Sequence, residues 1–105
     1  MRSNGWVDLE SVDEVVGPEL SFARKVTRTV EQPIAIIKCA AGGTTLGADW
    51  NPDKPSGFKL YPVLMNLIKG SLSALDKQGI PYRIEGFMWH QGENDMFVKE
   101  FMPHY

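Results

Sequence analysis

The chain has little of several features that would place a protein in a special class. It contains one cysteine, Cys39, among 105 residues, so no internal disulfide can form and the fold does not depend on oxidation. No apolar run approaches the roughly 20 residues that a membrane span needs. The amino terminus lacks the apolar core of a secretory signal. We therefore expect no membrane association, whereas the compartment stays open, because a leader could lie upstream.

Basic side chains are not in excess either. Eleven Lys and Arg stand against 13 Asp and Glu, which gives a net charge of −2, and the basic residues are scattered along the chain. These numbers exclude nucleic-acid binding through a basic face. With 43% hydrophobic and 23% charged residues, the composition is that of a globular protein rather than a disordered one. A chain of this length suits one domain at most.

Three segments have the pattern of helices. Pro18 fits a first helical turn and is followed by apolar residues at helical spacing, which predicts a helix over 18–31. An apolar stripe over 61–75 predicts a second helix, which Gly79 should end. Asp95 is expected to cap a third helix that begins directly after it.

Two segments have the pattern of strands. Residues 34–40 form an almost uninterrupted apolar run with three isoleucines, as in a strand covered on both faces, and residues 83–89, around the apolar run 84–88, are the second predicted strand. Alternation of helices and strands predicts an α/β fold with two parallel strands. Because two strands cannot complete such a sheet, we expect residues 1–105 to be the central part of one larger domain.

The loop after the first predicted strand contains Gly42 and Gly43, followed by Thr44. Their backbone N–H groups are unobstructed by side chains and suit an anion or a developing oxyanion. The alternative interpretation is a tight turn that requires positive φ. No Gly-Lys-Ser/Thr follows, so a nucleotide-binding P-loop is not supported.

Residues 89–95, Trp-His-Gln-Gly-Glu-Asn-Asp, follow the second predicted strand, and we call them the heptapeptide. Both loops would lie at the edge of the sheet where α/β folds bind ligands. Gln91 and Asn94 carry amide N–H donors for an oxyanion, or they form a turn that binds its own backbone. Glu93 either orients a neighbour or is solvated.

Other candidate residues have a structural and a functional interpretation. His90 lies near two carboxylates, but the spacing matches no standard zinc pattern, so no metal and no cofactor is expected. Trp50 and Trp89 could line a pocket for a sugar ring or pack in a core. Cys39 is interpreted as a small buried hydrophobic residue rather than a nucleophile.

Together, residues 17–23, residues 38–46 with Trp50, and the heptapeptide resemble the sialate O-acetylesterase-like family, which is carbohydrate esterase family 6 of the SGNH hydrolase superfamily. The resemblance runs from about residue 7 to residue 105. It implies a flavodoxin-like three-layer α/β/α fold, here incomplete, and hydrolysis of acetyl esters on sugars by a serine nucleophile. The expected partner is an acetylated carbohydrate, either xylan-like or sialic acid-like.

The resemblance also implies roles for individual residues. Oxyanion donors would be a backbone N–H of Gly42 or Gly43 and the side chain of Gln91, with Asn94 as a second candidate. Glu93 would organise the site. The substrate would be contacted by Thr44, Trp50 and His90.

The chain departs from the family pattern at the nucleophile and at the base. Ser3 and Asn4 match only half of the family's Gly-Gln-Ser-Asn motif, and His104 is preceded at three residues by Phe101 instead of aspartate. Hence we expect the nucleophile and the catalytic histidine to lie outside these residues, and this chain to supply the oxyanion half of the site. Two alternatives remain: a non-catalytic carbohydrate-binding or interaction module, and a fragment that does not fold alone.

Overall fold

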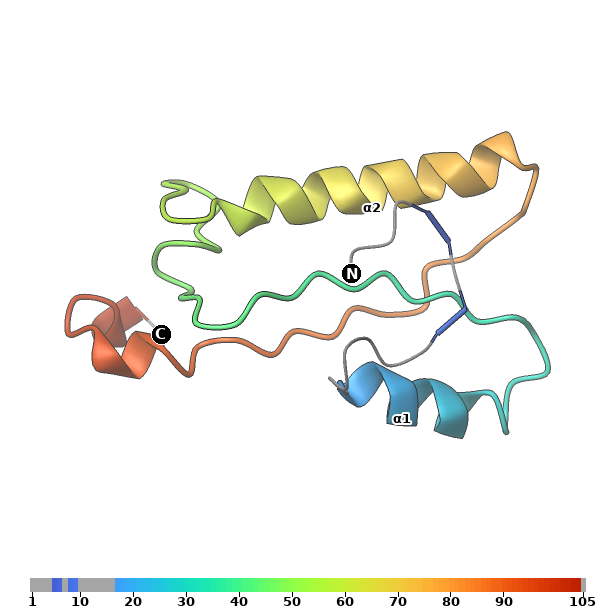
Figure 1. Ribbon diagram of the computed structural model, residues 1–105, viewed down its shortest axis with the longest axis horizontal. Coiled ribbons are helices and arrows are strands. Elements are labelled where there is room, and N and C mark those ends of the chain that lie inside the picture. The colour runs from blue at the N-terminus through green and yellow to red at the C-terminus, as the bar shows by residue number, and fades with distance from the viewer. Residues whose placement is uncertain (1–4, 7, 10–16, 105) are drawn as a thin grey trace. The chain divides into compact units, whose positions relative to one another are not determined.

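Two α-helices are the regular elements in the described part of this chain, for which we have a computed structural model (Figure 1). The structure describes residues 5–6, 8–9 and 17–104. The chain divides into two units, Met1–Lys38 and Cys39–Tyr105. Helix α1 belongs to the first unit, and helix α2 and two short 3-10 helices belong to the second.

Helix α1 spans Pro18–Val26 and begins where the sequence predicts, with proline in its first turn and no side-chain cap. It ends before residue 31, so the predicted length is wrong. The hydroxyl of Thr27 donates a hydrogen bond to the Ala23 carbonyl at 2.8 Å. The next residues are rich in β-branched side chains, which lose rotamer freedom in a helix and compete for backbone hydrogen bonds.

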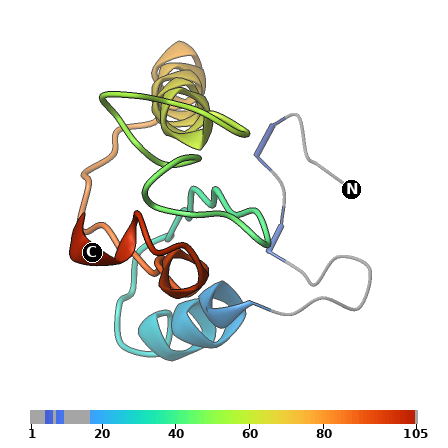
Figure 2. The same ribbon diagram turned by 90° about the vertical axis from the view of Figure 1, so that its left-hand side faces the viewer.

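Helix α2 spans Leu60–Lys77 and confirms the prediction from the apolar stripe; Figure 2 views it nearly along its axis. Gly79 has φ +67° and ends the helix as expected. The N–H of Ile80 donates to the Leu75 carbonyl and the N–H of Gly79 to the Asp76 carbonyl, both at 3.0 Å. These two bonds form a Schellman motif, in which glycine adopts the left-handed conformation without a Cβ penalty.

The two predicted strands are wrong, and with them the α/β, flavodoxin-like fold class. No strand is present among residues 5–6, 8–9 and 17–104, so the described chain contains no sheet. Residues 34–40 and 83–89 lack regular structure, and the second run is extended (Figure 1). An apolar run predicts a preference for burial, but a strand also needs hydrogen bonds to a neighbouring backbone. Neither run has such a ladder here.

The predicted third helix is replaced by two single turns of 3-10 helix, η1 at Asp95–Phe97 and η2 at Met102–His104. Asp95 does not cap: Asn94 occupies the N-cap position, and no side-chain cap is formed. The carboxylate of Asp95 is used elsewhere in the unit, as described below. The sequence therefore indicated that Asp95 is important, but the predicted role as a helix cap is wrong.

Few side chains are buried in the described residues, and most of these are polar. The buried apolar residues are Leu20 in the first unit and Trp50 in the second. Thr44, Asp49 and Asp95 are buried in the second unit as well. No helix in the described ranges has the length and apolar character to cross a membrane. Most of the buried side chains of the second unit are therefore polar, and they belong to the segments described in the next subsection.

Candidate functional site

The two glycines form an exposed turn in a segment that we call the diglycine loop, residues 41–51. Gly43 has φ +72°, which favours glycine. Thr44 closes the turn, because its hydroxyl donates to the Ala41 carbonyl at 3.0 Å. Within the described ranges, the backbone N–H groups of Gly42 and Gly43 have no hydrogen-bond acceptor. The turn therefore presents two free backbone donors to solvent.

Thr44 is 2% exposed and connects the diglycine loop to the heptapeptide. Gln91 Nε2 donates to the Thr44 carbonyl at 2.8 Å and lies 3.3 Å from its hydroxyl oxygen. Asn94 Nδ2 donates to the same carbonyl at 3.3 Å. The indole N–H of Trp50 donates to the Thr44 hydroxyl at 3.0 Å. The structure thus brings together residues that the sequence singled out, although 47 and more positions separate Thr44 from the two amides.

Asp95 makes a second connection between the same two segments. Its side chain is 2% exposed. Oδ2 accepts the N–H of Leu46 at 2.7 Å, and Oδ1 accepts the N–H of Gly47 at 2.8 Å. Sequence reasoning missed this role, because the spacing of 48 residues gives no local signal.

Asp49 holds the diglycine loop from within, and sequence reasoning missed it too. Oδ2 accepts the N–H and the hydroxyl of Thr45, at 2.9 and 3.1 Å. Oδ1 accepts the N–H of Phe58 at 2.9 Å. The hydrogen bond from Phe58, followed by those from Thr45, lowers the pKa of Asp49. The sequence signal that could have indicated this role is an aspartate, Asp49, four residues after a threonine, Thr45, in a loop that contains glycine.

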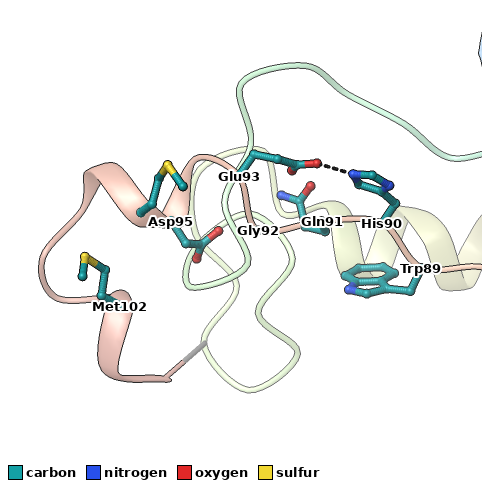
Figure 3. Close-up of a pocket in the computed structure, with 8 residues that line it drawn as sticks. Trp89, His90, Gln91, Gly92, Glu93, Asp95 and Met102 are labelled. Carbon is teal, nitrogen blue, oxygen red and sulfur yellow. Dashed lines mark ion pairs between the residues drawn. The ribbon is translucent and has the colours of Figure 1, made fainter.

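His90 and Glu93 form an ion pair at the rim of a pocket of about 670 Å³ (Figure 3). His90 Nε2 lies 2.6 Å from Glu93 Oε1, and both side chains are largely exposed. The pKa of Glu93 is lowered by its own backbone N–H and by His90. The pocket is lined by six residues of the heptapeptide, namely 89–93 and 95, with Met96 and Met102.

Trp50 and Trp89 are in contact but have different surroundings. Their rings are 5.3 Å apart at an interplanar angle of 87°, an edge-to-face arrangement. Trp50 is 5% exposed, whereas Trp89 is 45% exposed and lines the pocket. Phe87 stacks on Trp89 at 6.0 Å. Of the two tryptophans, Trp89 is therefore the one that a bound molecule can reach.

The residues that only partly match the family's nucleophile and histidine motifs were not expected to act in catalysis. Of these, Ser3 and Asn4 lie outside the described residues, and His104 belongs to η2. Within the part of the chain that the structure describes, no group of three or more His, Cys, Asp or Glu side chains is placed to hold a metal ion. The site offers hydrogen-bond donors, the His90–Glu93 pair and an aromatic wall.

Comparison with known proteins gives one match. A family model described as carbohydrate esterase, sialic acid-specific acetylesterase, matches residues 6–105. No curated protein and no solved structure matches the chain. The match covers nearly the whole chain, including the diglycine loop and the heptapeptide.

Proposed function

Because this chain belongs to the carbohydrate esterase family of sialic acid-specific acetylesterases, we propose that its diglycine loop and heptapeptide form the oxyanion-binding wall of an ester-hydrolysing site. The family is one of carboxylic ester hydrolases that act on carbohydrates. The reaction proposed for this chain's site is hydrolysis of O-acetyl esters on sugars. We assign no nucleophile to the described residues.

In this reaction a serine hydroxyl attacks the acetyl carbonyl carbon, and the carbonyl oxygen acquires negative charge in the tetrahedral intermediate. Donors fixed in advance at that oxygen stabilise the transition state by about 3–4 kcal/mol each. The N–H groups of Gly42 and Gly43 are the candidate donors. The observation that supports them is an exposed turn with two acceptor-free N–H groups, on a loop in which Thr44 and Leu46 are fixed by hydrogen bonds.

Gln91 and Asn94 have a supporting role in this proposal. Each donates an amide N–H to the Thr44 carbonyl, and this hydrogen bond fixes the turn next to its glycines. An amide nitrogen carries two hydrogens, so Asn94 keeps a second donor for the oxyanion. Gln91 Nε2 lies near both oxygens of Thr44 and acts mainly by holding the turn.

The pocket lined by residues of the heptapeptide is the proposed site for the sugar. Trp89 offers an aromatic face against which the apolar face of a sugar ring can pack. Glu93 and His90 offer an acceptor and a donor for hydroxyl groups at the rim. The buried Trp50 contributes indirectly, by packing against Trp89 and donating to Thr44.

The test uses the natural gene product that carries these residues, whatever its length, called the full-length protein below. Gln91→Ala and Asn94→Ala should each lower kcat for p-nitrophenyl acetate or an acetylated sugar by about ten- to a thousandfold, because the oxyanion donors lose their support. Asn66→Ala, which removes an exposed amide from α2, is the matched control and should leave kcat unchanged. Unchanged kcat in both Gln91→Ala and Asn94→Ala would exclude the proposed roles.

A non-catalytic carbohydrate-binding module remains the second candidate. It is favoured by the exposed Trp89 beside the His90–Glu93 pair, a surface that suits a sugar without any nucleophile. Calorimetry with acetylated and deacetylated xylo-oligosaccharides and sialic acids distinguishes the two functions. Binding without release of acetate would support the module, and release of acetate would support the esterase.

A further inference from the structure

The Asp95 carboxylate is in an unusual position for a charged group in this chain. It is 2% exposed, and each oxygen accepts a backbone N–H, from Leu46 at 2.7 Å and from Gly47 at 2.8 Å. A buried carboxylate is costly unless such bonds compensate for lost hydration. Hydrogen bonds to an ionised acceptor are short and about twice as strong as neutral ones. Asp95 therefore fixes two consecutive peptide groups of the diglycine loop.

The heptapeptide matches the diglycine loop in the order of its donors and acceptors. At Thr44 the loop presents a carbonyl, and Gln91 and Asn94 supply amide donors. At Leu46 and Gly47 the loop presents N–H groups, and Asp95 supplies a carboxylate. A shift of the loop along the heptapeptide would bring the carboxylate towards the Thr44 carbonyl, where two acceptors repel. The three side chains therefore allow one register only.

We infer that Asp95 is a positioning residue: by holding the N–H groups of Leu46 and Gly47, it fixes the register of the diglycine loop and so the place of the Gly42 and Gly43 N–H groups. The inference rests on the proposed oxyanion role of the two glycines. Its physical path is short, because Thr44 lies between the glycines and Leu46 and is itself closed onto Ala41. In this role Asp95 acts through the backbone of the diglycine loop, although it also lines the pocket proposed for the sugar.

Asp95→Asn in the full-length protein is the direct test, since asparagine has the same shape but one of its two acceptors becomes a donor. The amide protons of Leu46 and Gly47 should lose the downfield shift that a carboxylate acceptor causes. In a protein labelled with ¹⁵N-glycine and ¹⁵N-leucine, the Gly42 and Gly43 resonances should also move. The kcat for p-nitrophenyl acetate should fall about tenfold to a hundredfold with KM nearly unchanged, because the donors are displaced and this substrate carries no sugar to occupy the pocket.

Glu100→Gln removes an exposed carboxylate five residues further along and should change none of these signals. Asp95→Glu, which keeps the charge but displaces the oxygens, should act in the same direction as Asp95→Asn. Movement of Leu46 and Gly47 with unchanged glycine resonances would overturn the inference, because Asp95 would then have only a local role. Loss of cooperative unfolding in both variants would overturn it too, in favour of a folding role. If the unsubstituted full-length protein releases no acetate, the proposed function fails while the glycine resonances still decide the role of Asp95.

Discussion

The diglycine loop and residues 81–90 contrast sharply, although both belong to the second unit. In the loop, Thr44, Asp49 and Trp50 are buried and joined by hydrogen bonds to backbone and side chains. Every residue of 81–90 is exposed, including Ile84 and Phe87 at 68% each. Residues 81–90 are thus the more hydrophobic segment but make fewer contacts. The diglycine loop is more polar and contains glycine, yet it is held by more interactions.

The difference shows what fixes structure in this unit. Apolar side chains gain free energy only when other apolar surface covers them. The carboxylates of Asp49 and Asp95 and the amide of Gln91 need only a few backbone groups, which the diglycine loop and Phe58 supply. Substitutions in the two segments should therefore have unequal effects on stability.

Thr44→Val should have the largest effect. It removes the acceptor of the Trp50 indole and the donor to the Ala41 carbonyl, and the buried indole N–H loses its partner. We expect a loss of about 2–3 kcal/mol in the free energy of unfolding, measured by urea denaturation of the full-length protein. Thr29→Val, at an exposed position, is the control and should change it by less than about 0.5 kcal/mol. Equal losses in the free energy of unfolding for Thr44→Val and Thr29→Val would contradict the difference proposed between the diglycine loop and the exposed parts of the chain.

Asp49→Asn should have the next largest effect, about 2 kcal/mol, because hydrogen bonds to an ionised acceptor are replaced by weaker ones. The effect depends on pH. The folded state lowers the pKa of Asp49, so its stabilisation is complete above the unfolded value of about 4 and disappears as the pH falls through the folded value. Urea unfolding of both proteins from pH 7 to pH 2 should show their difference shrinking below about pH 4. A difference that grows with acidity would contradict the assignment.

Gly57→Ala should have a smaller effect, about 1–2 kcal/mol, because φ is +59° there and an added Cβ would lie 2.3 Å from Asp49 Oδ1. The matched control is Gly86→Ala in the exposed segment, where a Cβ would meet no atom within 4 Å. This control should change the melting temperature of the full-length protein by no more than about one degree. A comparable loss in both variants would show that the backbone at Gly86 is as constrained as the backbone at Gly57, which lies against Asp49 of the loop.

The helices were predictable because their signals are local. Pro18 marks the start of α1, and Gly79 marks the end of α2 through a conformation that glycine favours. The predicted strands failed because a strand needs a partner backbone, and an apolar run such as 34–40 does not specify one. The length of α1 failed because β-branched residues after Val26 outweighed the apolar spacing.

The candidate site was predictable in composition but not in connectivity. Glycines and amides were recognised by the chemistry that they offer, and the structure brings Gln91 and Asn94 to Thr44. Whether they serve as oxyanion donors stays a prediction. The carboxylate of Asp95 could not be assigned to Leu46 and Gly47, because a contact across 48 residues depends on how the chain folds back. Asp95 was predicted to be a helix cap because a helix was expected to follow it, and that helix is not formed.

The edge-to-face pair of Trp50 and Trp89 makes the pocket optically observable. One indole of the pair is shielded and the other is open to solvent, and their rings are 5.3 Å apart. A molecule that covers Trp89 removes water from one chromophore of an electronically coupled pair. The intrinsic fluorescence and near-ultraviolet circular dichroism of the unmodified protein therefore report occupancy of the pocket without any label.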